Sequence, residues 1–224
     1  MSRRKILEKL RKAVEQMEAP LAEKAAREAV AAGLDPVVAI NEGLAAGMKR
    51  VSELFDEGEV FVPHLLVAAE AFETGVAILT ESMSRETREQ ASQGRVLIHT
   101  VQGDIHDIGK NIVKTMLSAS GFEVIDLGRD VPVETVAAKA RELKVDIIAG
   151  AALMTTTMPA QRELVECLED QGIRRQFKLL FGGTPVSDEW VRRIGADGYA
   201  DSASAAIEVA RRLMAEKKAK IVLD

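Results

Sequence analysis

The sequence predicts an α/β protein in two parts, a four-helix bundle followed by a doubly wound (Rossmann-like, flavodoxin-like) parallel sheet. Up to residue 90, apolar residues recur at helical spacing almost throughout. Beyond that point, short runs rich in valine, isoleucine and leucine alternate with helical segments, a pattern typical of parallel strands that are buried on both faces. We therefore expect two domains, residues 1–90 and residues 91–224.

Proline and glycine mark the helices of the first domain. Apolar residues at helical spacing in 6–14 give the first helix its buried face. Pro20 and Pro36 suit the first turns of the second and third helices, with Asp35 as an N-cap. The Val-Pro pair at 62–63 opens a fourth helix. Four helices joined by short turns predict a small bundle.

The second domain is expected to repeat a strand–helix unit. A polar segment, residues 82–94, is predicted to be a linker that allows movement of one domain against the other. Strands are expected at 96–101, 122–127, 145–153 and 177–181, with a short fifth at 196–200. Helices are expected at 108–120, 133–143, 159–171, 187–194 and 203–217. In a doubly wound sheet, ligands bind at the carboxyl ends of the strands.

Composition narrows the class of protein. The 224 residues include 30 Lys and Arg against 35 Asp and Glu, a net charge of −5, and 47% are hydrophobic, which is enough to form a core. The chain has no uninterrupted apolar run of about 18 residues, so we expect no membrane span. A single cysteine, Cys167, forms no internal disulfide. We therefore expect a cytoplasmic protein that binds neither membrane nor nucleic acid.

The stretch after the first predicted strand carries the most chemistry. It contains Asp104, His106 and Gly109 in an Asp-x-His-x-x-Gly pattern. A neutral imidazole binds a transition metal through one ring nitrogen while the carboxylate accepts a hydrogen bond from the other, and the glycine lets a bulky planar group approach the backbone. The alternative is a surface histidine hydrogen-bonded to an aspartate. His64 and His99 are the other histidines, so a metal at His106 is expected to arrive already held by a cofactor.

Two further strand ends add small and hydroxyl-bearing residues. The third strand leads into Leu153, Thr155 and Thr157, and the fourth ends at Gly182 and Gly183. Parallel strands end at one edge of the sheet, so these residues would form a slot beside the histidine for a long ligand.

In this order, the motifs resemble the cobalamin-binding signature Asp-x-His-x-x-Gly, Ser-x-Leu, Gly-Gly. The second element is Ala151-x-Leu153 here, so alanine replaces its serine. With the bundle in front, the whole chain is similar to the methyltransferase-associated corrinoid proteins of methylamine, methanol and methyl-ether systems, and to the cobalamin-binding module of methionine synthase. The stretches Gly-Asp-Ile-His-Asp-Ile-Gly, Ala-Leu-Met-Thr-Thr-Thr-Met and Gly-Gly-Thr-Pro-Val-Ser carry the likeness.

The resemblance implies a role for each residue. His106 would be the lower axial ligand of cobalt, Asp104 would hold its other ring nitrogen, and Thr157 would extend this relay. The nucleotide tail of the cofactor would lie in a channel shaped by Gly109, Leu153, Thr155, Gly182 and Gly183. Phe61 would cap the upper face of the corrin, and its possible neighbours, which are otherwise core residues, are Met48, Val51 and Leu65. We expect Ala151 to weaken tail binding without abolishing it.

The function that the resemblance implies is that of a methyl carrier without turnover of its own. A substrate-specific methyltransferase would load the cobalt of cobalamin, which would alternate between methylcobalamin and the Co(I) corrinoid, and a second methyltransferase would unload it. A reductive activase is a further expected partner. The donor stays open among methanol, a methylamine, a methyl ether and betaine. The alternatives are a cobalamin-dependent sensor or regulator, the cobalamin subunit of a mutase, and a flavodoxin-like receiver without cofactor.

Overall fold

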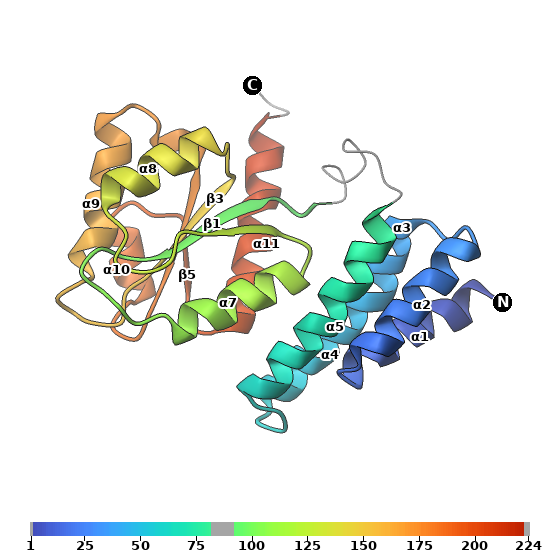
Figure 1. Cartoon of the computed structure of the whole chain (residues 1–224). Coiled ribbons are helices and arrows are strands. Elements are labelled where there is room, and N and C mark those ends of the chain that lie inside the picture. Colours follow the sequence, from blue (N-terminus) through green and yellow to red (C-terminus); the bar gives the residue numbers. More distant parts are fainter. Residues whose placement is uncertain (1, 82–91, 222–224) are drawn as a thin grey trace. The chain divides into compact units, whose positions relative to one another are not determined.

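The computed structural model describes residues 2–81 and 92–221 (Figure 1). These residues form two compact units, one helical and one α/β. The predicted domain boundary between 90 and 91, and most of the predicted linker, lie outside the described residues.

The helical unit contains the four predicted helical segments. Its elements are α1 (Arg3–Glu15), α2 (Ala19–Ala31), α3 (Pro36–Val38), the π-helix η1 (Ala39–Leu44), α4 (Ala45–Asp56) and α5 (Val62–Glu81). The apolar stripe of α1 is buried as predicted, and α2 turns four alanines inward, which allows it to pack closely along α5. Gly47 of α4 is needed for a similar approach, because a Cβ there would lie 2.5 Å from the carbonyl oxygen of Arg11.

The third helix differs from the continuous α-helix that its periodicity predicts. Asp35 caps it as expected, since its Oδ1 accepts a hydrogen bond from the Val38 backbone N–H at 3.0 Å. The chain then widens into η1 before it continues as α4. Within η1, Gly43 lies so close to α1 that a Cβ would be 2.9 Å from the Leu10 side chain. The wider turn accompanies this tight packing, which hydrophobic spacing alone does not reveal.

The fourth helix, α5, is long and apolar enough to cross a membrane by length and composition alone. Its largest apolar side chains on one side, Leu65, Phe72 and Leu79, are buried inside the helical unit. The packing of this side accounts for part of the apolar composition of α5, while Leu66 and Val67 are exposed.

The α/β unit is a five-stranded parallel sheet flanked by helices. Its strands are β1 (Arg95–Thr100), β2 (Glu123–Asp126), β3 (Ile147–Ala151), β4 (Lys178–Gly182) and β5 (Gly198–Ala200). Its helices are α7 (Ile108–Ala119), α8 (Val133–Glu142), α9 (Pro159–Asp170), the 3₁₀-helix η2 (Arg174–Gln176), α10 (Asp188–Arg193) and α11 (Ala203–Ile221). Every predicted strand and helix of this unit is present, and the predicted fold class is confirmed.

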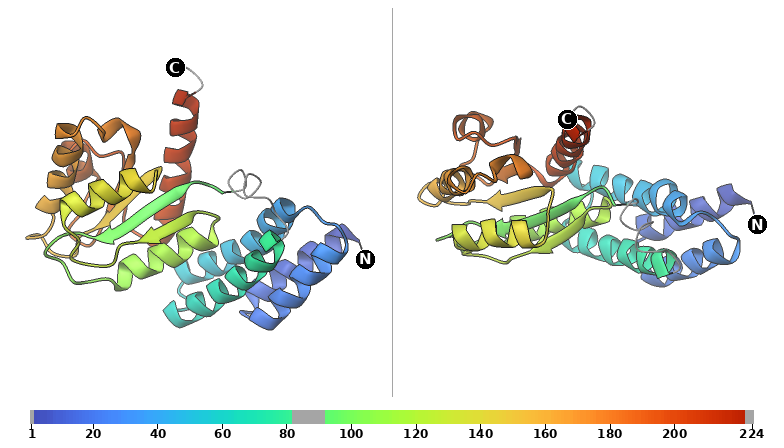
Figure 2. Two further views of the ribbon diagram at one scale, coloured as in Figure 1. Left: turned by 45° about the horizontal axis from the view of Figure 1, so that its top comes forward. Right: turned by 90° about the horizontal axis from the view of Figure 1, so that it is seen from above.

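The strand order is β2-β1-β3-β4-β5, so the chain reverses direction across the sheet between β1 and β3. Right-handed crossovers then place α8, α9 and α10 on one face of the sheet and α7 on the other (Figures 1 and 2). A large apolar core lies under α8, α9 and α10, and α11 contacts β4 and β5. In this topology the ligand crevice opens at the carboxyl ends of β1 and β3.

Candidate functional site

The predicted ligand residues meet at this reversal point of the sheet. Asp104 and His106 lie in the loop between β1 and α7, and Leu153 and Thr157 lie in the loop between β3 and α9. The two loops come together because β1 and β3 are neighbours, paired from Val96 with Ile147 onward.

Asp104 joins the two loops. Its carboxylate is fully buried, and Oδ1 accepts hydrogen bonds from the His106 backbone N–H at 3.0 Å and from the His106 ring Nδ1 at 2.7 Å. Its Oδ2 accepts from the Leu153 backbone N–H at 2.7 Å, the Met154 backbone N–H at 3.3 Å and the Thr157 hydroxyl at 2.8 Å. Five donors around one carboxylate make a rigid link between the ends of β1 and β3.

These donors also determine the charge of Asp104. Burial by itself would raise the pKa of this carboxyl group, because it penalises the charged form. The hydrogen bonds from the backbone of His106, the backbone of Leu153 and the Thr157 hydroxyl outweigh burial and lower the pKa well below its usual value. Asp104 is therefore an anion at neutral pH and acts as a hydrogen-bond acceptor.

The bond to Asp104 determines which ring nitrogen of His106 is available. Since Asp104 Oδ1 accepts from Nδ1, a neutral His106 carries its proton on Nδ1 and leaves the lone pair of Nε2 free. The His106 side chain is 47% exposed, so Nε2 is accessible from outside the unit. This is the arrangement in which a carboxylate orients an imidazole for a metal.

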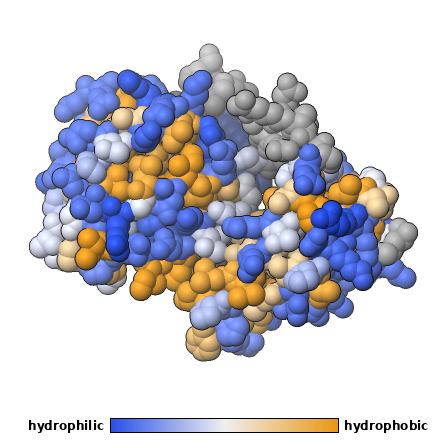
Figure 3. Space-filling view, viewed as in Figure 1, coloured by the Kyte–Doolittle hydropathy of each residue, from blue (hydrophilic) through white to orange (hydrophobic). Residues whose placement is uncertain are grey.

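Apolar side chains surround the histidine at the surface. Ile105 is 63% exposed and Ile108 is 76% exposed, and Leu153 and Met154 are also exposed. Figure 3 shows apolar side chains among polar ones on the visible surface of the molecule. Large exposed apolar groups beside a metal-binding nitrogen fit a planar, largely apolar cofactor that lies over the histidine.

The signature glycines divide into two kinds. A Cβ on Gly109 would have no atom within 4 Å, so the protein leaves open space there. A Cβ on Gly182 would lie 2.7 Å from the carbonyl oxygen of Ala200, and one on Gly183 would overlap the carbonyl oxygen of Ala152. Gly182 and Gly183 are thus required by the packing of their own strands, which holds with or without a ligand, whereas no contact within the protein requires glycine at 109.

Sequence reasoning missed several groups that shape the site. The backbone N–H groups of Leu153 and Met154 cannot be predicted from residue type, because any residue but proline provides such a donor. A buried lysine, Lys110, pairs with Asp126 at 2.7 Å across α7 and β2. Burial would raise the pKa of Asp126, and the hydrogen bond from Lys110 lowers it below the usual value. In the sequence, Lys110 is visible only as a lysine in a predicted helix that also carries apolar residues.

The remaining predicted residues lie at different depths. Thr155 is exposed beyond the end of β3, and Ala151 is half-buried as the last residue of that strand. In the helical unit, Phe61 is 62% exposed, and its backbone N–H donates to Nδ1 of His64 at 3.1 Å. The three predicted neighbours of Phe61 are buried core residues, Met48, Val51 and Leu65. The role of Phe61 as a cap stays a prediction.

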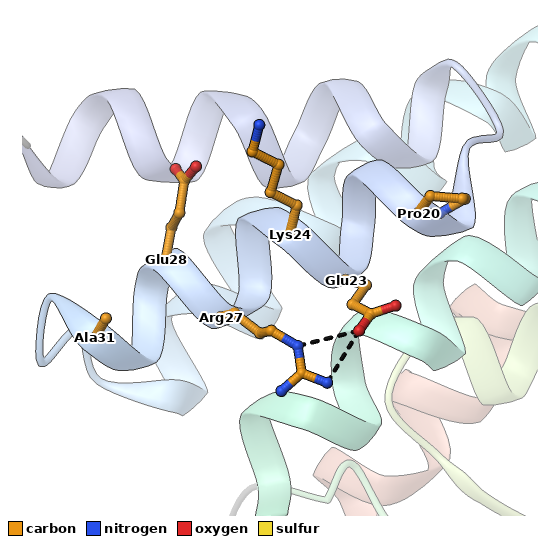
Figure 4. A pocket seen from close by; sticks show the side chains of 6 residues that line it. All are labelled: Pro20, Glu23, Lys24, Arg27, Glu28 and Ala31. Atoms are coloured by element: carbon orange, nitrogen blue, oxygen red, sulfur yellow. Dashed lines mark hydrogen bonds and ion pairs between the residues drawn. The ribbon is translucent and has the colours of Figure 1, made fainter.

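A hollow on the surface of α2 offers no chemistry of this kind. It is lined by Pro20, Glu23, Lys24, Arg27, Glu28 and Ala31 (Figure 4). Arg27 donates to Glu23 at 2.9 and 3.0 Å, and Glu28 pairs with Lys9 of α1. These exposed ion pairs are typical of a solvated helix surface.

The donor set fits a metal that is held by a cofactor. Among residues 2–81 and 92–221, no group of three or more histidine, cysteine, aspartate and glutamate side chains is placed to hold a metal ion. His106 offers one nitrogen, with a fixed tautomer, an apolar rim and open space at Gly109. A tetrapyrrole-like metal cofactor needs one axial ligand and such a surface, so the residues present fit cobalamin.

Comparison with known proteins decides the family. Residues 6–80 and 94–208 each match a family model described as a B12 binding domain. The chain is 46% identical over 213 residues to trimethylamine corrinoid protein 1 of Methanosarcina acetivorans, which covers 95% of this chain and 99% of that protein. The chain belongs to the B12-binding corrinoid proteins. Its cofactor is cobalamin, as the resemblance of its motifs predicts.

Further relatives carry the same assignment. This corrinoid protein is 46% identical over 191 residues to dimethylamine corrinoid protein 1 of Methanosarcina acetivorans, with 85% of this chain and 89% of that protein covered. A chain in the crystal structure of the methanol:cobalamin methyltransferase complex of Methanosarcina barkeri is 34% identical, with a TM-score of 0.82, and the match covers 96% of this chain and 81% of that chain.

Proposed function

We propose that this corrinoid protein carries methyl groups from a substrate-specific methyltransferase to a second, acceptor methyltransferase. Cobalamin supplies a cobalt atom that accepts and releases methyl groups when it is bound. The observation that carries the proposal is the Asp104–His106 pair at the β1–β3 reversal, with Nε2 of His106 accessible and its tautomer fixed. We expect the protein to act in the cytoplasm and to depend on a reductive activase, because a cobalt that becomes oxidised must be returned to its active state.

Each residue of the site has a distinct task in this proposal. His106 would bind the cobalt through Nε2 as its lower ligand, and Asp104 holds the ring by accepting from Nδ1. The Thr157 hydroxyl keeps Oδ2 of Asp104 hydrogen-bonded, so this carboxylate directs no free lone pair at the bound cofactor. Ile105 and Ile108 provide apolar contact and exclude water around the axial nitrogen. The channel for the nucleotide tail would begin at the open space beside Gly109.

The donor that we favour is a methylated amine. Relatives that are 45–47% identical to this chain are named for trimethylamine or dimethylamine. The test is methylation of the reduced, cobalamin-loaded protein by purified methyltransferases specific for trimethylamine, dimethylamine or methanol, followed by absorbance. Fastest methylation with the methanol enzyme would contradict this choice of donor.

The first test of cofactor binding is a titration of the apo protein with hydroxocobalamin, with free cofactor then removed. We expect the wild type to retain the cofactor and His106→Ala to show a changed spectrum and weaker retention. Thr157→Val removes the hydroxyl bonded to Asp104, and Thr156→Val is the matched control because Thr156 is exposed and its hydroxyl is not bonded to Asp104. Retention and spectra that are identical in wild type and His106→Ala would refute histidine ligation.

A sensor or regulator is the second candidate, because such proteins use the same cofactor. It predicts a large change in association state or partner binding between light and dark, or between loaded and apo forms. A carrier instead predicts methyl transfer with both partner enzymes and little change in association state. The mutase alternative would require binding to a carbon-skeleton mutase barrel in place of a methyltransferase.

A further inference from the structure

We propose that Asp130 is a positioning residue for the cobalt-ligand loop, an inference that rests on the proposed function. Asp130 lies in the loop between β2 and α8, outside every motif of the family signature used above. It contacts the backbone on both sides of Asp104, and through Asp104 it determines where the His106 ring points.

Two hydrogen bonds tie Asp130 to the ligand loop. Its Oδ1 accepts from the backbone N–H of Gly103 at 2.7 Å, and its own backbone N–H donates to the carbonyl oxygen of Asp104 at 3.0 Å. The residue before Asp104 and Asp104 itself are therefore both held by one side chain and one amide of the neighbouring loop. Asp104 then faces His106 on one side and the β3 loop on the other.

The backbone conformation of Asp130 indicates that the loop keeps this contact at a cost in conformational free energy. Its φ is +52°, in the left-handed region, which aspartate enters more readily than most residues but glycine enters freely. Gly103, its partner, has a φ of +83°. A glycine at 130 would relieve the strain at no steric cost, but it would lack the carboxylate that accepts from Gly103. Among common residues, aspartate and asparagine offer both the conformation and the acceptor.

The other bonds of the loop on this side lie toward its ends or are longer, such as the 3.4 Å bond from the Val133 backbone N–H to the Gln102 side chain. The Thr100 hydroxyl donates to the carbonyl oxygen of His106 at 3.1 Å, and Val101 bridges to Val131 next to Asp130. These bonds hold the two ends of the loop, while Asp130 holds its middle. Without the Gly103 bond, Asp104 keeps its five donors and the bond from its own backbone N–H to the Val101 carbonyl oxygen at 3.1 Å, but the Gln102–Gly103 peptide loses its acceptor. A shift of this peptide moves Asp104, and the 2.7 Å bond to Nδ1 passes the shift to the imidazole.

The test compares three variants of the full-length protein. Asp130→Asn keeps the acceptor and the left-handed conformation, Asp130→Gly keeps the conformation but loses the acceptor, and Asp130→Ala loses both. Each is loaded with Co(II) cobinamide, which lacks the nucleotide tail and its benzimidazole, so a nitrogen bound to cobalt below the ring comes from the protein. The readouts are the nitrogen splitting in the electron paramagnetic resonance spectrum of this complex and its dissociation constant. Urea unfolding of the apo proteins measures stability in parallel.

We expect Asp130→Asn to match the wild type in both readouts. Asp130→Gly should lose much of the nitrogen-split signal and bind cobinamide roughly five- to tenfold more weakly, the effect of one lost hydrogen bond of ordinary strength. Asp130→Ala should show the same spectral loss together with lower apo stability. Full nitrogen splitting in Asp130→Gly would overturn the proposal and leave Asp130 a purely structural residue. Failure of the wild type itself to bind cobalamin would instead refute the proposed function.

Discussion

His99 makes the stability of the α/β unit depend on pH. It lies in β1 and is 2% exposed, and its Nδ1 has no hydrogen-bond partner in the described part of the chain. Burial lowers the pKa of its imidazole to about 4, with a smaller lowering by Lys110, although the Ala149 backbone and Asp126 act in the opposite direction. The folded chain therefore keeps His99 neutral at a pH where the unfolded chain binds a proton.

The sign and size follow from the two pKa values. Because the folded pKa is lower than the unfolded value of 6.5, the stabilising effect is complete above pH 6.5 and is lost as the pH falls toward 4. Between pH 7 and pH 5 the free energy of unfolding should fall by about 2 kcal/mol from this residue alone. Asp104 and Asp126 have lowered pKa values and so lose their charge below this range.

The assay is urea unfolding of the apo protein at pH 7, 6 and 5, followed by the fluorescence of Trp190. This is the single tryptophan of the chain, and it lies in α10 of the α/β unit. His99→Leu replaces the imidazole with an apolar group that does not titrate, and His64→Gln is the control because His64 belongs to the helical unit. We expect the pH-dependent loss to shrink by about 2 kcal/mol in His99→Leu and to persist in His64→Gln. An unchanged pH dependence in His99→Leu would refute the reasoning.

Three further predictions concern single residues of the site and of the helical unit. Gly109→Leu should leave apo stability unchanged or slightly raised but reduce cobalamin retention by more than tenfold, as measured by gel filtration of the loaded protein. Gly183→Ala should instead reduce soluble yield and apo stability by several kcal/mol, since its Cβ would overlap the Ala152 carbonyl; wild-type stability in urea would contradict this packing. His64 occupies the N3 position of α5 and accepts from the N-cap backbone N–H of Phe61, so His64→Ala should lose about 1 kcal/mol of thermal stability and His64→Gln should lose less.

Much of the fold could be predicted because its elements repeat a simple pattern. The first four strands lie within two residues of the predicted ranges at every end, since uninterrupted runs of valine, isoleucine and leucine are what a doubly covered sheet requires. The start of the third helix was predicted from Asp35 and Pro36, whose capping chemistry is local. The π-helix within it was not, because it depends on how closely Gly43 packs on α1.

The residues of the candidate site also divide into those that the sequence predicts and those that it does not. Asp104, His106 and Thr157 could be selected because a carboxylate, an imidazole and a hydroxyl carry recognisable chemistry, and the order of the strands brings their loops together. The amide of Leu153 and the clamp by Asp130 could not, since their roles come from position in three dimensions. Short motifs identify the groups that react with a ligand more readily than those that hold them in place.

The different surroundings of Gly109 and Gly183 have a consequence for how related sequences should diverge. In the proposed site a bound cofactor is what requires glycine at 109, where the protein itself leaves open space, whereas Gly183 is held by the Ala152 carbonyl whatever the cofactor state. A descendant that lost cobalamin would be free to accumulate larger residues at 109 within a few mutations, yet it would keep glycine at 183. The ratio of variation at these two positions would thus record, in genomes alone, which lineages still load the cofactor.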